Sequence, residues 1–310
     1  MSNTETAAAE TTAVGTTTVG ATATAERSAV RTVTGHRTTE GDGFVVRRPF
    51  PGPALDMFDP FLLLDEMGPT MVEPGKGVGT PDHPHRGFET VTYLIDGELE
   101  HRDSLGNGGL LGAGDTQWMT AGAGIIHKEG PSARLQKTGG RSHGFQLWVN
   151  LPAALKVTPP RYQDIRADAV AVADLEGGGR ARVIAGTLFG VDGPGSTLTP
   201  ISYAHVSMPA GTSASTQVPA EHNVGVLVFG GSAEVGGVTA ADGQFVILGK
   251  GTVVTLRAHT DTELLVLVGQ PLNEPVARYG PFVMNTRAEL AQAFEDYQSG
   301  RMGSIPAITV

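Results

Sequence analysis

The sequence predicts an all-β protein made of two similar barrel or sandwich domains, with one helix near its C-terminus. Three observations support this prediction. The 310 residues are enough for two domains of about 150 residues each. The 43 glycines and 20 prolines suit short strands joined by tight turns better than long helices. Two series of short β-rich runs, separated by an irregular stretch, have similar internal patterns.

Residues 1–27 differ from the rest of the chain. They are almost all Ala, Thr, Gly and Val without a period, so we expect a disordered tail. The tail has no Lys or Arg before Arg27 and carries acidic residues, unlike the basic start of a secretion signal. No run of the sequence approaches the roughly 18 apolar residues of a membrane span. We therefore expect a cytoplasmic protein that does not enter the membrane.

Residues 28–155 are predicted to form the first barrel. Short β-type runs such as "FVVRRPF", "FLLLDE" and "HGFQLWVN" alternate there with clusters of Gly, Pro and Asp. In "LIDGELE", Asp96 and Gly97 lie between two such runs, and this pair predicts a hairpin.

Residues 156–310 are predicted to form the second barrel. The beginning of this half is irregular, and Pro159 and Pro160 fit a linker or a strand that crosses between the domains. The later run "GVLVFGGSAEV" resembles "GFETVTYLIDGELE" in the first half. This similarity indicates a duplicated domain.

One helix is predicted near residues 286–299, inside the second domain. Thr286 and Glu289 have the spacing of a capping box, and Gly300 is suited to end the helix. One face of the helix carries Leu290, Phe294 and Tyr297. We expect this apolar face to pack against the protein.

The composition excludes several kinds of site. The net charge is −10, which argues against direct binding of nucleic acid because such binding needs a basic face. The chain has no cysteine, so disulfides, thiolate metal sites and cysteine nucleophiles are excluded. Any metal must therefore be held by His, Asp, Glu or water.

Two pairs of polar residues predict a metal site. His83 and His85 are one residue apart in "PDHPHRGFETV", and so are His127 and Glu129 in "IIHKEG". Alternate residues of a strand point to the same face, so each pair presents two donors together. On neighbouring strands the pairs would converge into three imidazoles and one carboxylate, a set that suits a divalent transition metal with open coordination positions. Either pair alone is weak evidence, but the two together in one domain favour the metal site.

Glu89 offers a second carboxylate. On a regular strand it lies on the same face as His85, four residues earlier. It is then a metal ligand in place of Glu129, a residue that orients an imidazole, or a hydrogen-bonded polar residue of the barrel interior. Spacing alone does not decide between Glu89 and Glu129.

Other candidates are weaker. His101 is close enough in sequence to face a pocket mouth, but a turn or surface role is favoured. Arg86 is expected to form a structural ion pair rather than to bind an anionic substrate group. His222 lies where the second half echoes the first, yet no second histidine accompanies it. A metal site is therefore expected in the first barrel only.

These residues carry a resemblance to a known family. The first motif of the cupin superfamily is matched by Gly77, His83, His85 and Glu89, with the closing Gly97 one position later than usual. The segments "PDHPHRGFETVTYLIDGELEHRDSLGN", "GDTQWMTAGAGIIHKEG" and "GPFVMNTRAELAQAFEDYQSGRMG" resemble signature segments of the pirin family. The resemblance implies a bicupin: two double-stranded β-helix barrels packed face to face, with the C-terminal segment wrapped over the first barrel.

The resemblance also implies the ligands of the metal. Pirins hold one metal, usually iron, and the matching positions here are His83, His85, His127 and Glu129. The match favours Glu129 over Glu89 as the carboxylate ligand. Fe(II) is expected, although the same donors accept manganese, nickel, cobalt, copper or zinc. Because histidines bind metals in the neutral form, we expect metal retention to weaken below about pH 6.5.

Two functions follow from the resemblance. The pirin-like bacterial proteins imply a quercetin dioxygenase, which opens the ring of a flavonol with dioxygen. In such an enzyme Glu129 is the first candidate for the general base and Glu89 the second. Other members of the family imply a regulatory protein whose metal or redox state controls a protein partner, either a transcription cofactor or a modulator of a metabolic enzyme. A shared fold does not decide between these functions.

Overall fold

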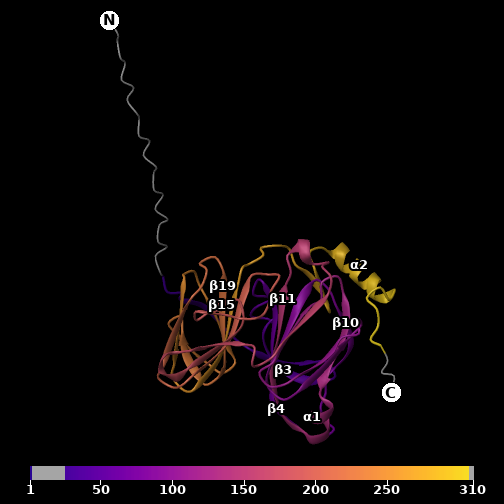
Figure 1. Ribbon diagram of the computed structural model, residues 1–310, viewed down its shortest axis with the longest axis horizontal. Coiled ribbons are helices and arrows are strands. Elements are labelled where there is room, and N and C mark those ends of the chain that lie inside the picture. Colours follow the sequence, from indigo (N-terminus) through magenta and orange to yellow (C-terminus); the bar gives the residue numbers. More distant parts are fainter. Residues whose placement is uncertain (2–24, 307–310) are drawn as a thin grey trace.

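The protein folds into two β-barrels that lie side by side (Figure 1), as seen in a computed structural model that describes residues 1 and 25–306. Each barrel consists of one seven-stranded and one four-stranded antiparallel sheet. This confirms the predicted bicupin. Most of the predicted tail lies outside the described residues. Arg27, which was included in the tail, is 3% exposed, and its guanidinium donates hydrogen bonds to the carbonyls of Pro219 and Gly249.

The first barrel contains the strands that carry the predicted ligands. Its large sheet has the order β12 (Arg161–Ile165), β9 (Thr116–Thr120), β6 (Phe88–Asp96), β11 (Gly140–Asn150), β4 (Phe61–Val72), β3 (Phe44–Phe50) and β2 (His36–Glu40). Its small sheet has the order β5 (Thr80–His85), β10 (Ile125–Pro131), β7 (Leu99–Asp103) and β8 (Gly108–Leu111). The short helix α1 (Ala133–Thr138) follows β10.

The second barrel repeats this plan. Its large sheet has the order β1 (Ala29–Thr34), β22 (Gln244–Leu248), β19 (Asn223–Gly230), β24 (Thr262–Gly269), β17 (Ile201–Met208), β14 (Arg180–Ala185) and β13 (Ala171–Asp174). Its small sheet has the order β18 (Ser213–Gln217), β23 (Val253–Ala258), β20 (Ser232–Val235) and β21 (Val238–Ala241). The short elements are β15 (Thr187–Leu188), β16 (Val191–Asp192), η1 (Ala153–Leu155) and η2 (Glu176–Gly178). Its core is packed with Ala, Val and Leu side chains.

The two barrels exchange edge strands. β1 comes from the first half of the chain but pairs with β22 of the second barrel. β12 comes from the second half but pairs with β9 of the first barrel. The predicted boundary between residues 155 and 156 therefore does not coincide with the sheets, because strand pairing is not visible in local sequence. The irregular stretch around Pro159 and Pro160 does lead into a crossing strand.

A single apolar core joins the barrels. The first barrel contributes Phe50, Phe61, Val91, Tyr93, Trp118 and Phe145, and the second contributes Tyr203, Leu227, Phe229, Phe245, Leu265 and Leu267. Within this core the Tyr93 hydroxyl lies 2.8 Å from the Nδ1 atom of His205. Packing of this kind fixes the barrels face to face.

The predicted hairpin at Asp96 and Gly97 is wrong. β6 pairs with β9 and β11 in the large sheet, whereas β7 pairs with β8 and β10 in the small sheet. Gly97 has a φ of 95°, so the chain turns a corner from one sheet to the other at this residue.

The end of the chain returns to the first barrel. It forms β25 (Ala277–Tyr279), β26 (Phe282–Met284) and α2 (Arg287–Gln298), which lies on the outer side of that barrel (Figure 1). The capping box of Thr286 and Glu289 is present, as predicted. The helix packs through Leu290 and Phe294 against a small cluster that includes Ile126.

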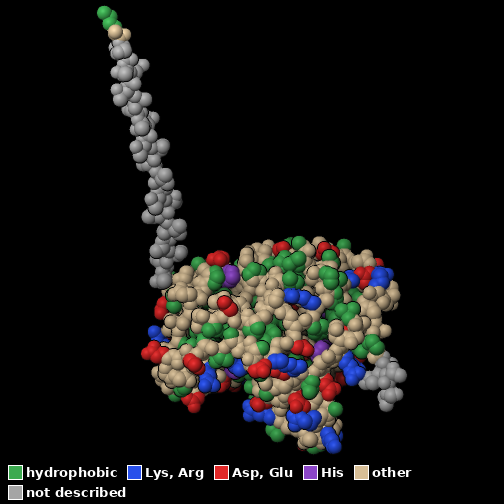
Figure 2. Space-filling view, in the orientation of Figure 1, with side chains coloured by type: hydrophobic (Ala, Val, Ile, Leu, Met, Phe, Trp, Pro, Cys, Tyr) green, Lys and Arg blue, Asp and Glu red, His purple; other side chains and the backbone are tan. Residues whose placement is uncertain are grey.

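The surface mixes charges of both signs. On the face shown in Figure 2, Lys and Arg side chains lie among Asp and Glu side chains. None of the helices in the described part of the chain has the length and apolar character of a membrane-spanning helix.

Candidate metal centre

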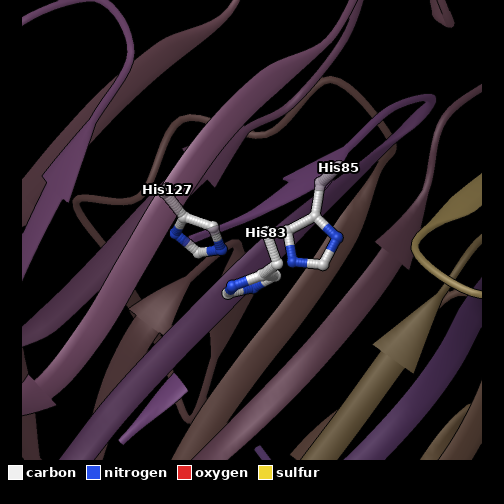
Figure 3. Close-up of side chains that lie close together, drawn as sticks. All are labelled: His83, His85 and His127. Atoms are coloured by element: carbon white, nitrogen blue, oxygen red, sulfur yellow. The ribbon is translucent and has the colours of Figure 1, made fainter. Parts of the chain in front are cut away.

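Three imidazoles converge inside the first barrel. β5 and β10 are paired antiparallel, and this register places His127 directly opposite His83. Strand alternation places His85 on the same face as His83. One ring nitrogen from each of the three histidines lies within 4.8 Å of the others, and Figure 3 shows the rings turned toward one another. The two predicted pairs thus do lie on neighbouring strands.

Backbone carbonyls orient two of these rings. The Nδ1 atom of His83 lies 2.8 Å from the carbonyl oxygen of Pro81, and that of His85 lies 3.3 Å from the carbonyl oxygen of Pro281. A carbonyl can only accept a hydrogen bond, so each Nδ1 must donate its proton. A neutral imidazole then has a free lone pair on Nε2, and this is the atom available to a metal.

His127 supports the presence of a metal ion. It is 1% exposed, and neither of its ring nitrogens has a hydrogen-bond partner among the described residues. Buried polar atoms are normally paired. An unpaired imidazole beside two oriented imidazoles therefore has the properties of a metal ligand. The three histidines therefore form a cluster that can hold a metal ion.

Burial keeps these imidazoles neutral. The pKa of His85 is well below its usual value because of burial and then because of His83. The pKa of His127 is also well below its usual value, through burial first and the neighbouring histidines second. Neutral imidazoles are the form that binds metals, so the protons of these rings compete little with a cation.

Glu129 lies in the same cavity but outside the cluster of three nitrogens. It is 8% exposed, and its Oε1 atom accepts a hydrogen bond of 3.3 Å from the Thr92 hydroxyl. Burial raises the pKa of Glu129 to about 7. The amide of Gln146 lies 3.5 Å from the same hydroxyl, so Gln146 and Thr92 together orient the carboxylate. Glu129 as fourth ligand remains a prediction.

The structure does not bring Glu89 to the imidazoles. Thr92 on β6 faces Glu129, and Glu89 lies three residues earlier, on the opposite face of the strand. There it is fully buried and accepts a hydrogen bond of 2.6 Å from the hydroxyl of Thr120. The expectation that Glu89 shares a face with His85 assumed one continuous strand. β5 ends at His85 and β6 begins at Phe88, in the other sheet.

His101 lies beside the site, although a turn or surface role was expected for it. It lies directly opposite Glu129 in the pairing of β7 with β10, and it is 3% exposed rather than on the surface. Neither ring nitrogen has a partner in the described residues, and the ring stacks on Tyr162 with centroids 5.1 Å apart. The sequence offers no signal for this burial, because residues 100–103 are all polar, and the alternation of exposed and buried residues along β7 is visible only in the structure. Arg86 forms the expected ion pair, at 2.7 Å from Asp296.

Two cavities meet beside the imidazoles. The first, of about 660 Å³, is lined by His83, His85, Glu129, Gln146 and Trp148 and by part of β25 and β26. The ring of Trp148 lies 5.2 Å from that of His85 and so forms an aromatic wall. A second cavity of about 990 Å³ extends toward the second barrel and shares Glu129 and Gln146 with the first. A volume of 300–1,000 Å³ is typical of small-molecule sites.

The arrangement has a definite chemical capacity. Three nitrogen donors and a nearby carboxylate suit a divalent transition metal, and the adjoining cavity leaves room for a ligand beside it. The buried carboxylate, with a pKa near neutrality, can exchange a proton with such a ligand.

Comparison with known proteins agrees with this geometry. The family profile described as pirin matches residues 43–149, and the profile described as pirin C-terminal cupin domain matches residues 203–303. A pirin-like protein of Caulobacter vibrioides is 43% identical, over 89% of this chain and 99% of its own. A Pseudomonas aeruginosa protein with the provisional name quercetin 2,3-dioxygenase is 45% identical, over 84% of this chain and 93% of its own. The crystal structure of a quercetin 2,3-dioxygenase from Acinetobacter baumannii has a TM-score of 0.87 and 41% identity, covering 91% of this chain and all of that one.

Proposed function

The chain belongs to the pirin family, and on that premise we propose that it is a metal-dependent dioxygenase that opens the ring of quercetin or a related flavonol. The observation that carries the proposal is a cluster of three imidazoles, two of them oriented by carbonyls, beside a cavity that His83, His85 and the buried carboxylate of Glu129 line. Relatives named for this activity support it.

The metal ligands in this proposal are His83, His85, His127 and Glu129, and the metal is Fe(II). When bound, the ion would act as a Lewis acid toward the enolic oxygen of the flavonol and as a template for substrate and dioxygen. The unpaired ring nitrogens of His127 and the free Nε2 lone pairs of His83 and His85 fit this role. Manganese, nickel, cobalt, copper or zinc would also fit these donors.

Glu129 is the proposed general base. Of the two candidate carboxylates, only Glu129 is among the residues that line the cavity. Glu89 lies on the opposite face of β6, where it is hydrogen-bonded to Thr120. In the absence of a metal, burial raises the pKa of Glu129 to about 7, so the carboxylate can exchange a proton near neutral pH. Thr92 holds the carboxylate toward the cavity, where it would accept the proton of the flavonol 3-hydroxyl.

The cavity walls would bind the rest of the substrate. Trp148 offers an aromatic surface beside His85, and a planar flavonol ring can stack on such a surface. The cavity also removes the substrate from bulk water, which strengthens each polar contact inside it.

Turnover of quercetin tests the proposal. Protein loaded with Fe(II) under argon is mixed with quercetin and then exposed to air, while flavonol absorbance and released carbon monoxide are followed. Loss of absorbance with stoichiometric carbon monoxide is expected. A fully metal-loaded protein without turnover would contradict the enzyme and favour the alternative function, a regulatory protein that responds through its metal.

A matched pair of variants tests the ligands. His83→Ala is expected to reduce bound metal by orders of magnitude, because it removes one of three nitrogen donors. His222→Ala in the second barrel removes a histidine that lies outside the cluster, and its metal content should equal that of the wild type. Stoichiometric metal in His83→Ala, measured by elemental analysis after dialysis, would disprove the ligand set.

A further inference from the structure

The C-terminal strap, residues 277–301, touches the metal centre although it is remote in sequence. The strap comprises β25, β26 and α2. Pro281, between the two strands, provides the carbonyl that accepts the Nδ1–H of His85, 196 residues earlier. The amide of Val283 donates a hydrogen bond of 3.1 Å to the carbonyl of Arg86, the neighbour of His85. One ligand is therefore oriented by the far end of the chain.

An ion pair fastens the strap at this point. The guanidinium of Arg86 lies 2.7 Å from a carboxylate oxygen of Asp296 on α2, and both side chains are largely buried, at 11% and 15% exposure. The Nε atom of Arg86 donates a hydrogen bond of 2.6 Å to the carbonyl of Ala123. Arg301 contacts the same carboxylate from the end of the strap. Asp296 thus joins α2 to the turn that follows the paired histidines.

We propose that Asp296 is a positioning residue for the metal centre. Its ion pair with Arg86 holds the strap against β5, so that the Pro281 carbonyl keeps the proton of His85 on Nδ1. The Nε2 lone pair of His85 is then directed at the other two imidazoles. The inference depends on metal binding by the three histidines and holds whether or not a flavonol is the substrate.

The physical reason is the choice between two tautomers. A neutral imidazole carries one proton, and the ring nitrogen that carries it cannot bind a metal. Without the carbonyl acceptor, the proton of His85 is free to occupy Nε2. Metal binding must then first restore the Nδ1–H form, which lowers the affinity. Loss of a partner that orients a ligand typically weakens metal binding by about 10–100-fold.

The test compares two neighbouring carboxylates on α2. Asp296→Asn removes the charge that holds Arg86. Glu295→Gln removes the same charge one residue earlier on the same helix, where the side chain is exposed. Dissociation constants for Co(II) are measured for the full-length chain by titration of its visible absorption. We expect Asp296→Asn to bind Co(II) about tenfold more weakly or worse. Glu295→Gln should match the wild type.

The tautomer of His85 separates positioning from a general loss of stability. In metal-free protein with 15N-labelled histidine, His85 should be Nδ1-protonated in the wild type and in Glu295→Gln. Asp296→Asn should show both tautomers. Asp296→Glu keeps the charge and should recover most of the Co(II) affinity. If Asp296→Asn fails to fold, Arg86→Lys replaces it, because a single ammonium lacks the separate Nε and Nη1 donors with which the guanidinium reaches Ala123 and Asp296.

Three outcomes would overturn the proposal. They are unchanged Co(II) affinity in a folded Asp296→Asn or Arg86→Lys, an equal loss in Glu295→Gln, or a single Nδ1-protonated form of His85 in every variant. Absence of quercetin turnover would contradict the proposed reaction but would leave these measurements unaffected.

Discussion

Glu129 and Glu89 show how the environment of a single residue determines its chemistry. Both are buried glutamates of the first barrel, and burial raises the pKa of each. Thr120 donates a hydrogen bond to Glu89 on the face of β6 that points away from Glu129, whereas Glu129 lines the cavity beside the histidines. Sequence spacing left the two equivalent, because it does not reveal where β5 ends and β6 begins.

The pKa values predict which group controls metal binding as the pH falls. At pH 6 the imidazoles of His85 and His127 are neutral, since burial lowers their pKa, whereas Glu129 is protonated because its pKa is about 7. If Glu129 is a ligand, a metal must displace that proton. Affinity should then be flat above pH 7 and fall by up to about tenfold per pH unit below it. The sequence predicted that protonation of the histidines weakens metal binding below about pH 6.5. The structure instead makes protonation of Glu129 the step that weakens it.

The variant Glu129→Gln tests whether Glu129 or a histidine causes the loss of metal affinity at low pH. The variant should bind Co(II) more weakly at pH 8, because a ligand charge is lost, but with little further change down to pH 6. A pH slope equal to that of the wild type would show that another group titrates. Calorimetric titration at pH 6, 7 and 8 measures both effects.

At the scale of elements, the local signals were reliable and the long-range contacts were not. The capping box predicted the start of α2 because all its atoms lie within four residues. The alternation of His83 with His85 predicted that these two side chains lie together, and both are in the cluster of three imidazoles. The contact of His85 with Pro281 spans 196 residues and has no local signature, so the sequence could not reveal it. The hairpin predicted at Asp96 and Gly97 was wrong for a related reason. An Asp-Gly turn has the same local sequence whether it joins two strands of one sheet or strands of two sheets.

Lys156 links three elements near the metal centre. It is 1% exposed, and its ammonium donates hydrogen bonds to the carbonyls of Gly87 and Val283 and to the side chain of Asn150, at 2.7–3.0 Å. These acceptors belong to the turn before β6, to β26 and to the end of β11. Lys156→Met would leave three buried acceptors without a donor, each of which costs about 1–3 kcal/mol.

We therefore expect Lys156→Met to lower the free energy of unfolding by about 3 kcal/mol or more. Lys137→Met provides the control, because Lys137 is an exposed lysine of α1, where substitutions usually change stability by less than about 0.5 kcal/mol. Urea unfolding of the two variants measures the difference. Equal midpoints would show that water replaces the lost donor.

At the scale of the whole molecule, the two barrels form one folding unit. Each large sheet is completed by an edge strand from the other half of the chain, β1 in one direction and β12 in the other. The apolar core between the barrels is built from both halves, and the C-terminal strap returns to the first barrel. Composition and length predicted two domains, but they could not predict this exchange. The local sequence of an edge strand does not indicate which sheet the strand joins.

The exchange predicts the behaviour of a divided chain. If the chain is cut between residues 157 and 158, each fragment still carries a strand that belongs in the other barrel. Co-expressed fragments 25–157 and 158–306 should therefore co-purify as one particle of full-length size, because backbone pairing and the shared core both hold them together. Starting the first fragment at residue 35 removes β1 while leaving the rest of that fragment intact. On dilution, the pair without β1 should dissociate at a higher protein concentration than the pair that retains β1, as measured by size-exclusion chromatography. Identical dissociation with and without β1 would show that the pairing of β1 with β22 does not contribute to the association of the fragments. Fragments that fold separately and stay monomeric would show that each barrel is stable without the exchanged strand and without the shared apolar core.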